Sequence, residues 1–280
     1  AGPDAVMGHE VVAEVDVDPT GAHSPGELVV VFPPRGCGDC YWCRRGEPRH
    51  CEQPDDDRWG GYAEYAVYPA DHLLPVPSGL SPEVATLADP LGVAARAVEM
   101  ARPGSGDVVY VNGLGPIGLS VVSMLIGAGC RVIGGDLRED RRKMAELLGP
   151  IQTVDPYRED PYELGREMDP AGPTVAFECS GSPQGLQEIF DAAGPGGTVA
   201  ILGIPKQPVL LLRMTVREQS AFSIAGPTIA SMEAALDHLA TDSRLSSIIT
   251  STVSLEEAHE AFEGLVEARG DVKVLIDPRR

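Results

Sequence analysis

The chain has 280 residues, of which 42 are acidic and 22 basic, and its formal net charge at pH 7 is −20. A surface this acidic repels phosphate backbones, so we expect no nucleic-acid partner. The sequence shows no apolar run long enough to cross a membrane and no signal peptide at its N-terminus, so we expect a cytoplasmic protein with no membrane partner.

The first eighty residues have the pattern of β-strands and loops. Short β-branched or alternating runs predict strands at 11–18, 28–32 and 63–68, with glycine and proline between them. Four cysteines lie between the second and third runs. We therefore expect a β-rich domain over residues 1–82 that includes a metal-binding loop at 36–51.

From about residue 83, helical and strand patterns alternate. Apolar residues at helical spacing predict a helix at 84–101. Further helices are predicted at 116–129, 138–149 and 183–194, strands at 108–112, 130–136, 174–181 and 198–204, and a surface connection or short helix at 155–172. This alternation predicts an α/β fold with a doubly wound parallel sheet, a Rossmann domain, over residues 83–226.

The last segment, residues 227–280, has a different pattern. Helices are predicted at 231–240 and 255–268, the second with Ser254 as its N-cap, and a closing strand at 272–276.

The chain contains only three lysines, at positions 143, 206 and 273. Two origins of the acidic, lysine-poor composition stay open, namely adaptation to high salt and a GC-rich genome.

A glycine-rich turn joins the strand at 108–112 to the helix that follows. It has the G-x-G-x-x-G pattern, and its residues are Gly113, Leu114, Gly115, Pro116, Ile117 and Gly118. The first glycine permits the tight turn, the second lets a pyrophosphate approach the backbone, and the third lets the helix pack on the strand. Free N–H groups at the helix N-terminus favour the phosphates. The pattern predicts a dinucleotide site; a glycine-rich turn of another βαβ protein is the alternative.

Asp136 ends the next predicted strand, eighteen residues after Gly118. A carboxylate there accepts hydrogen bonds from the ribose hydroxyls of NAD and repels the 2′-phosphate of NADP. Arg138, Arg141 and Arg142 follow and could hold that phosphate, and Asp136 could instead cap the next helix. The spacing favours NAD.

The four cysteines follow the pattern C-x2-C-x2-C-x7-C, with Cys37, Cys40, Cys43 and Cys51. Four thiolates this close can surround one tetrahedral zinc ion and leave no position open, which is typical of a structural site. Two disulfides or buried free thiols are the alternatives.

Two further positions carry possible metal ligands. His9 and Glu10 lie side by side just before the first strand, and Asp89 precedes Pro90 at the start of a helix. Taken alone, the first pair is explained by a surface His–Glu contact. Asp89 is explained equally well as an N-cap before a proline at the first helical position.

The order of these motifs, GHE, then the cysteine loop, then the glycine-rich turn, resembles the zinc-containing medium-chain alcohol and polyol dehydrogenase family, with sorbitol and threonine dehydrogenases as the nearest types. Segments 60–67, 89–98, 177–186 and 196–204 are also similar to it. The resemblance implies a GroES-like first domain to which the last segment returns, and a Rossmann domain that binds NAD.

The resemblance also implies roles for single residues. His9, Glu10 and Asp89 would hold a catalytic zinc, with Glu10 as a direct or alternating ligand. Asp136 would bind the adenosine ribose with Arg141 close by, and further residues would line the cofactor, namely Cys179, Gly181, Leu202 and Gly203. Pairing at the end of the sheet, near residues 215–227, would give a homodimer or homotetramer.

One departure concerns the start of the chain. Family members carry, before GHE, further strands of the GroES-like domain, a cysteine that is the first ligand of the catalytic zinc, and a serine or threonine that relays a proton. None of these is in the 280 residues. We therefore expect an incomplete GroES-like domain and a catalytic zinc site that lacks one ligand.

The resulting hypothesis is a zinc-dependent NAD(H) oxidoreductase that acts on a secondary alcohol or its ketone, such as a polyol or sugar. The alternative is a catalytically impaired NAD(H)-binding protein that retains only the structural zinc. An NADPH-dependent reductase without a catalytic metal is a third hypothesis, which the presence of GHE disfavours.

Overall fold

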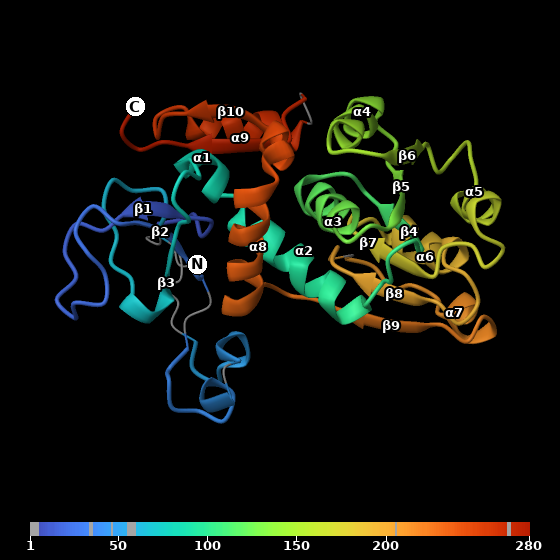
Figure 1. Ribbon diagram of the computed structural model, residues 1–280, viewed down its shortest axis with the longest axis horizontal. Helices are drawn as coiled ribbons and strands as arrows, with labels where there is room; N and C mark the ends of the chain where they lie inside the picture. Colours follow the sequence, from blue (N-terminus) through green and yellow to red (C-terminus); the bar gives the residue numbers. More distant parts are fainter. Residues whose placement is uncertain (1–5, 34–35, 46, 55–59, 205, 268–269) are drawn as a thin grey trace. The chain divides into compact units, whose positions relative to one another are not determined.

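The computed structural model describes residues 6–33, 36–45, 47–54, 60–204, 206–267 and 270–280 (Figure 1). The chain divides into two compact units. The first comprises residues 1–89, 228–241 and 249–280, and the second comprises residues 90–227 and 242–248. The first unit is thus assembled from both ends of the chain.

The second unit contains a six-stranded parallel sheet in the order β6-β5-β4-β7-β8-β9. The strands are β4 (Val108–Asn112), β5 (Arg131–Gly135), β6 (Ile151–Val154), β7 (Val175–Glu178), β8 (Thr198–Ile201) and β9 (Ser220–Ser223). Every residue of β4 and β7 is buried, as expected for central strands covered on both faces. This order confirms the predicted doubly wound Rossmann sheet.

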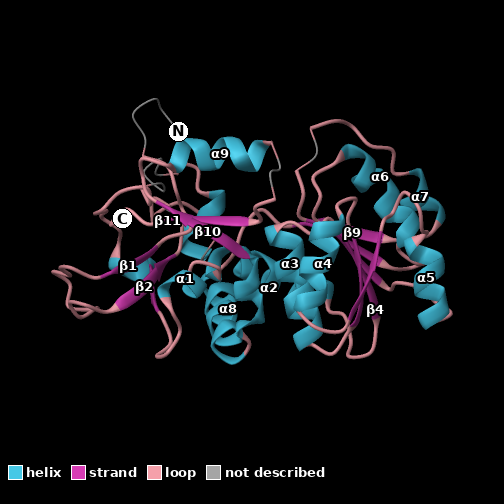
Figure 2. Ribbon diagram, turned by 90° about the horizontal axis from the view of Figure 1, so that it is seen from above, coloured by secondary structure: helices cyan, strands magenta, loops and turns pink. Residues whose placement is uncertain are grey.

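Helices cover both faces of this sheet. They are α2 (Ala88–Ala101), which begins at the boundary between the units, and α3 (Pro116–Gly127), α4 (Glu139–Leu147), α5 (Pro161–Met168), α6 (Pro183–Ala192) and α7 (Leu212–Val216). Figure 2 shows α3 and α4 on one side of the strands and α5 and α6 on the other. Leu186, Ile189 and Phe190 of α6 pack with Val108 and Tyr110 of β4 in the core.

The first unit holds two small sheets. The strands β1 (Val12–Glu14), β2 (Leu28–Val31) and β3 (Leu73–Pro75) are antiparallel, whereas β10 (Ile249–Val253) and β11 (Lys273–Ile276) are parallel. The helices are α1 (Pro82–Ala85), α8 (Ile229–Thr241) and α9 (Ala258–Val266). Met232 and Leu236 of α8 pack with Val30, Phe32 and Leu74 in one apolar cluster. Residues from opposite ends of the sequence therefore share this core.

The predicted strand at 63–68 is wrong. Tyr65 and Val67 are 81% and 88% exposed, and no strand pairing involves this segment among the described residues. Alternating polarity alone does not make a strand, because the backbone groups need a neighbouring strand as partner. The segment is instead held at Gly61 and Tyr62, whose N–H groups donate to Gly8 and Met7.

The predicted N-cap of the last helix is also wrong. Helix α9 begins at Ala258, with Glu257 as its N-cap. Ser254 and Glu257 bond each other reciprocally, at 2.9 Å and 3.4 Å, across a turn that precedes the helix. The residue at 268, the last of the predicted helix, lies outside the described residues.

Among the described residues, none of the helices combines the length and the hydropathy that crossing a membrane requires.

Candidate functional site

The glycine-rich turn lies between β4 and α3, at the centre of the sheet. Gly113 has φ = +89°, a conformation that favours glycine, and a Cβ there would meet the backbone of Ser180 at 2.6 Å. A Cβ on Gly118 would collide with the Gly113 carbonyl oxygen. A Cβ on Gly115, in contrast, would meet nothing within 4 Å. The first and third glycines are thus required by packing, while the second borders open space.

The N-terminus of α3 is suited to an anion. Its N-cap is Gly115, which provides no side-chain cap, and Pro116 takes the first helical position. The helix has 12 residues, and the backbone N–H groups of its first turn have no partner within the helix. The pyrophosphate of a dinucleotide fits this position by charge and by the absence of a side chain at Gly115.

Asp136 follows β5 and is hydrogen-bonded to the glycine-rich turn. Its Oδ2 accepts from the Leu114 N–H at 2.8 Å, and its Oδ1 accepts from the Arg138 N–H at 2.9 Å. The Arg142 guanidinium donates to the Asp136 carbonyl at 2.6 Å, and Arg138 pairs with Asp140. Arg138 and Arg142 are therefore engaged locally. Arg141 is half-buried.

Glu178, which the sequence reasoning missed, organises the neighbouring strand ends. It is fully buried at the end of β7, and its carboxylate accepts from the Ser180 N–H at 2.9 Å, the Gly181 N–H at 3.3 Å and the Ser180 hydroxyl. Its carbonyl accepts from the N–H groups of Leu202 and Gly203. Desolvation by burial raises the pKa of this carboxyl.

The predicted cofactor residues after β7 and β8 lie together through this network. Gly181 has φ = +66°, and a Cβ on Gly203 would collide with the Gly181 N–H and the Glu178 carboxylate. The Cβ of Cys179 lies 3.4 Å from the position that a Cβ on Gly118 would take. The loop after β7 thus contacts the glycine-rich turn, and the loop after β8 packs against the loop after β7.

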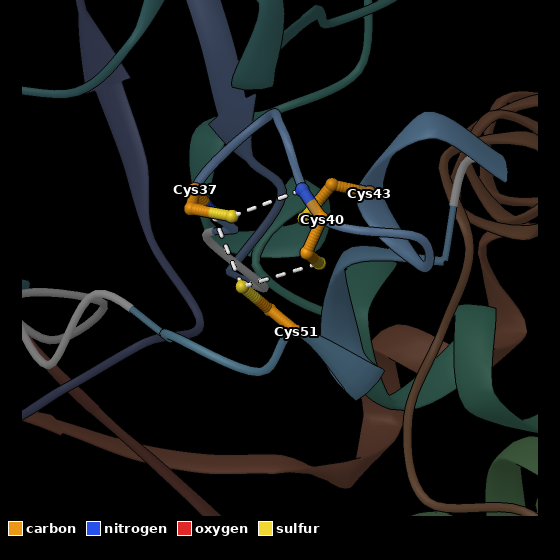
Figure 3. A group of neighbouring side chains, drawn as sticks. All are labelled: Cys37, Cys40, Cys43 and Cys51. Atoms are coloured by element: carbon orange, nitrogen blue, oxygen red, sulfur yellow. Dashed lines mark hydrogen bonds between the residues drawn. The ribbon is translucent and has the colours of Figure 1, made fainter.

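The four predicted cysteines form one cluster. Their Sγ atoms all lie within 4.8 Å of one another, and all are free thiols rather than disulfides. The Sγ atoms of Cys40 and Cys51 are 3.9 Å apart, far beyond the length of a disulfide bond. Figure 3 shows the sulfurs of Cys37, Cys40 and Cys51 pointing toward one another.

Backbone N–H groups of the loop favour negative charge on most of these sulfurs, which is the form that binds a cation. The N–H groups of Cys37 and Gln53 donate to Cys51 Sγ, and the Cys40 N–H donates to Cys37 Sγ at 3.3 Å. Backbone N–H groups at Cys43 and Glu52 lower the pKa of Cys40 to about 6. Desolvation raises the pKa of Cys43 to about 12. Four sulfur donors at this separation fit a closed tetrahedral zinc site.

A second cluster of possible ligands lies in the first unit. His9, Glu10 and Asp89 each place one ligand atom within 4.8 Å of the others. Gly8, with φ = +90°, leaves no room for a side chain because a Cβ would meet the Tyr62 ring at 2.7 Å. The close contact between residues 7–8 and 61–62 fixes the backbone that carries His9 and Glu10.

Asp89 is 7% exposed, and its buried Oδ2 accepts no hydrogen bond. Burial raises the pKa of this carboxyl to about 7. An N-cap role is wrong, because α2 already begins at Ala88 and Asp89 lies in its first turn. A buried carboxylate oxygen without a partner is costly unless a ligand satisfies it. The imidazole and carboxylate donors present here fit a zinc ion.

Lys273, which the sequence reasoning also missed, contacts this cluster. Its Nζ forms an ion pair with Oε2 of Glu10. The lysine side chain is 15% exposed and the glutamate side chain 28%. Desolvation by burial lowers the pKa of Lys273 to about 8. The scarcity of lysine in the chain was the one signal in the sequence that singled this residue out.

Two family models match the chain. The model of the alcohol dehydrogenase GroES-like domain matches residues 1–78, and the model of the zinc-binding dehydrogenase matches residues 116–241.

Among curated proteins, the chain is similar to L-threonine 3-dehydrogenase of Pyrococcus horikoshii, with 36% identity over 209 residues that cover 72% of this chain and 60% of the relative. It is also similar to the starvation-sensing protein RspB of Escherichia coli, with 30% identity over 231 residues that cover 78% of this chain and 67% of the relative. The match therefore spans only about 60% of the threonine dehydrogenase.

Among solved structures, the fold is similar to that of the rspB alcohol dehydrogenase of Escherichia coli CFT073, which was crystallised with NADH. The TM-score is 0.83 at 27% identity, and the match covers 96% of this chain and 83% of that one.

Proposed function

Because the chain belongs to the zinc-containing medium-chain dehydrogenase family, we propose that it transfers a hydride between a secondary alcohol and NAD(H). A polyol, a sugar or a similar hydroxyl compound is the substrate class, with the corresponding ketone as product. The convergence of His9, Glu10 and Asp89 within 4.8 Å is the observation that carries this proposal. The similarity to a threonine dehydrogenase supports a secondary alcohol.

The proposed reaction gives separate roles to different residues of the chain. A zinc ion, when bound, supplies a Lewis acid for the substrate oxygen. His9 and Asp89 would hold the ion, and the burial of Asp89 would limit the access of water to it. Asp136 would orient the adenosine ribose, and the first turn of α3 would bind the pyrophosphate. The four cysteines would hold a separate, structural zinc.

Metal analysis combined with an alcohol-oxidation assay tests the function. We expect two zinc ions per chain and NADH formation that depends on a secondary alcohol. His9→Ala should reduce the metal content by one ion per chain and abolish NADH formation, because a ligand of the proposed catalytic site is lost. His259→Ala is a matched control, since this exposed imidazole on α9 forms an ion pair with the surface residue Glu263. A single zinc ion per chain and no alcohol-dependent NADH would refute the proposal.

One observation favours a second candidate, a non-catalytic NAD(H)-binding protein. Glu10 is engaged by Lys273, which competes with a cation for that carboxylate. This candidate predicts one zinc ion per chain, in the cysteine loop, and NADH binding without turnover. The same metal analysis and assay separate it from the dehydrogenase.

NAD in preference to NADP is the proposed cofactor. Asp136→Ala should weaken NADH binding at least about tenfold and change NADPH binding less, because the carboxylate favours ribose hydroxyls and repels a 2′-phosphate. Fluorescence titration with both dinucleotides measures the ratio. Asp191→Ala, on α6 in an exposed pair with Arg213, is the control and should leave both affinities unchanged. An unchanged NADH-to-NADPH ratio for Asp136→Ala would contradict the assignment.

A homodimer or homotetramer through the β9 edge is the proposed assembly. Five large apolar residues in the segment between β8 and β9 are more than half exposed, namely Ile204, Leu210, Leu211, Leu212 and Val216. Exposed apolar groups of this kind mark interaction surfaces. We expect the wild-type chain to be oligomeric by light scattering and the double change Leu212→Glu with Val216→Glu to give a monomer. A monomeric wild type at micromolar concentration would rule this surface out.

A further inference from the structure

Glu178 at the end of β7 is fully buried, and its carboxylate accepts hydrogen bonds from neutral groups. The donors are the N–H groups of Ser180 and Gly181 and the Ser180 hydroxyl. Desolvation raises the pKa of this carboxyl, so its ionisation at neutral pH lowers the stability of the fold. A neutral side chain of similar size would be easier to bury. The carboxylate therefore needs an explanation other than packing.

The order of the strands places Glu178 beside the proposed dinucleotide site. Four neighbouring strands of the sheet follow the order β5-β4-β7-β8. Asp136 follows β5, the glycine-rich turn follows β4, and Leu202 and Gly203 follow β8. A dinucleotide lies across the carboxyl ends of such strands. With the adenosine ribose at Asp136 and the pyrophosphate at α3, the nicotinamide half faces the ends of β7 and β8.

Glu178 holds the loops after both of these strands. Its side chain binds the loop after β7 through Ser180 and Gly181. Its carbonyl accepts from the N–H groups of Leu202 at 2.8 Å and Gly203 at 2.9 Å, in the loop after β8. A Cβ on Gly203 would collide with the Glu178 carboxylate, so the second loop packs directly on the charged group. One residue thus fixes two neighbouring loops.

The glycine-rich turn is also held by hydrogen bonds that do not involve Glu178. The Gly113 N–H donates to the Gly135 carbonyl at 2.8 Å, and the Leu114 N–H donates to the Asp136 carboxylate at 2.8 Å. Both acceptors belong to β5 or to the residue that follows it. The groups proposed for the adenosine half therefore have their own support, on the side of the sheet away from Glu178.

We propose that Glu178 is a positioning residue, whose carboxylate holds the loops after β7 and β8 in the conformation that binds the nicotinamide half of the dinucleotide. The inference rests on the proposed binding of NAD(H). The carboxylate acts through the loops, because its burial keeps it out of contact with a ligand. Only an ionised carboxyl offers acceptors at both oxygens, whereas an amide turns an N–H donor toward one of the loop donors.

Calorimetric titration of the full chain with NADH and with AMP tests this role without relying on turnover. Glu178→Gln keeps the size of the side chain and replaces one acceptor by a donor. We expect it to weaken NADH binding at least about tenfold, because a buried loop N–H loses its partner and the loop moves. AMP binding should change less than about twofold, because AMP contains only the adenosine half. Asp136→Ala, in contrast, should weaken the binding of both ligands.

Glu163→Gln is the matched control. This exposed glutamate on α5 forms a surface ion pair with Arg166, so its replacement should leave the affinities for NADH and AMP unchanged. Thermal melting of each variant confirms that the preparation is folded. Equal weakening of NADH and AMP binding by Glu178→Gln would show a general loss of structure and would overturn the inference, as would an unchanged NADH affinity.

Ser180→Ala keeps the test valid if Glu178→Gln does not fold. It removes the hydroxyl that donates to the carboxylate, and it should weaken NADH binding about threefold with little effect on AMP. In the double variant the loss should be no larger than in Glu178→Gln alone, because the hydroxyl acts through the carboxylate. Additive losses, or normal NADH binding by Ser180→Ala, would contradict this role.

The same titrations separate this inference from the proposed function. If the wild type binds neither NADH nor AMP, the proposed function itself fails, and the role of Glu178 fails with it. If the wild type binds both ligands and Glu178→Gln behaves like it, only the role of Glu178 fails.

Discussion

Replacing Cys43 by alanine is expected to remove one zinc ion per chain and to lower the melting temperature by roughly 10 °C or more, because the free energy of binding a structural metal is part of the free energy of folding. The loop from Cys37 to Cys51 has short 3-10 turns and no buried residue within them. The metal would replace the missing apolar core. Calorimetry and metal analysis of the same sample measure both effects.

Cys130→Ser is the matched control for this prediction. Cys130 is a buried thiol outside the cluster, and its Sγ donates to the Gly104 carbonyl at 3.6 Å, a bond that a serine hydroxyl can replace. It should keep the full zinc content. Chelation of the wild type should reproduce the loss of stability of Cys43→Ala. If Cys43→Ala melted at the wild-type temperature, the loop would not be a structural zinc site.

Alanine at Gly118 and alanine at Gly115 are expected to differ in their effect on stability. Gly118→Ala should reduce both stability and NADH affinity, the latter at least about tenfold, because the new Cβ would collide with the Gly113 carbonyl oxygen and force α3 away from β4. Gly115→Ala should cost stability only about 1 kcal/mol or less, since its φ of −75° suits any residue and open space surrounds the new methyl group.

NADH binding is the informative measurement for Gly115→Ala. If the pyrophosphate lies against this glycine, the methyl group occupies its place, and affinity should fall at least about tenfold although the protein stays folded. Fluorescence titration and thermal melting on the same preparation separate the two effects. Normal NADH binding by Gly115→Ala would place the dinucleotide elsewhere.

The sequence predicted those features that depend on local spacing. The buried strand at 108–112 and the glycines after it identified the Rossmann sheet, and the spacing of Cys37, Cys40, Cys43 and Cys51 identified a cluster that the structure brings together. Local sequence was sufficient in both cases, because a tight turn and a short metal loop are determined by neighbouring residues.

Several features that depend on distant partners were not predicted. Strands β6 and β9 lie at the two edges of the sheet and carry polar residues, so their patterns are weak. The pair between Lys273 and Glu10 joins opposite ends of the chain, and nothing near either residue specifies the other. The strand prediction at 63–68 was wrong for the converse reason, since its pattern suits a strand but no strand among the described residues pairs with it.

The discontinuous composition of the first unit has a consequence for biosynthesis. The sheet of the second unit lies within residues 90–227, so it is complete when the chain has emerged to about that point. The first unit needs Met232 and Leu236 for its core, and the ligand cluster at His9 receives Lys273 only with the closing strand. Domains generally fold as they are synthesised. We therefore expect the dinucleotide fold to form first on the ribosome. The apolar surface of the N-terminal strands should stay exposed until the last fifty residues or so have been synthesised.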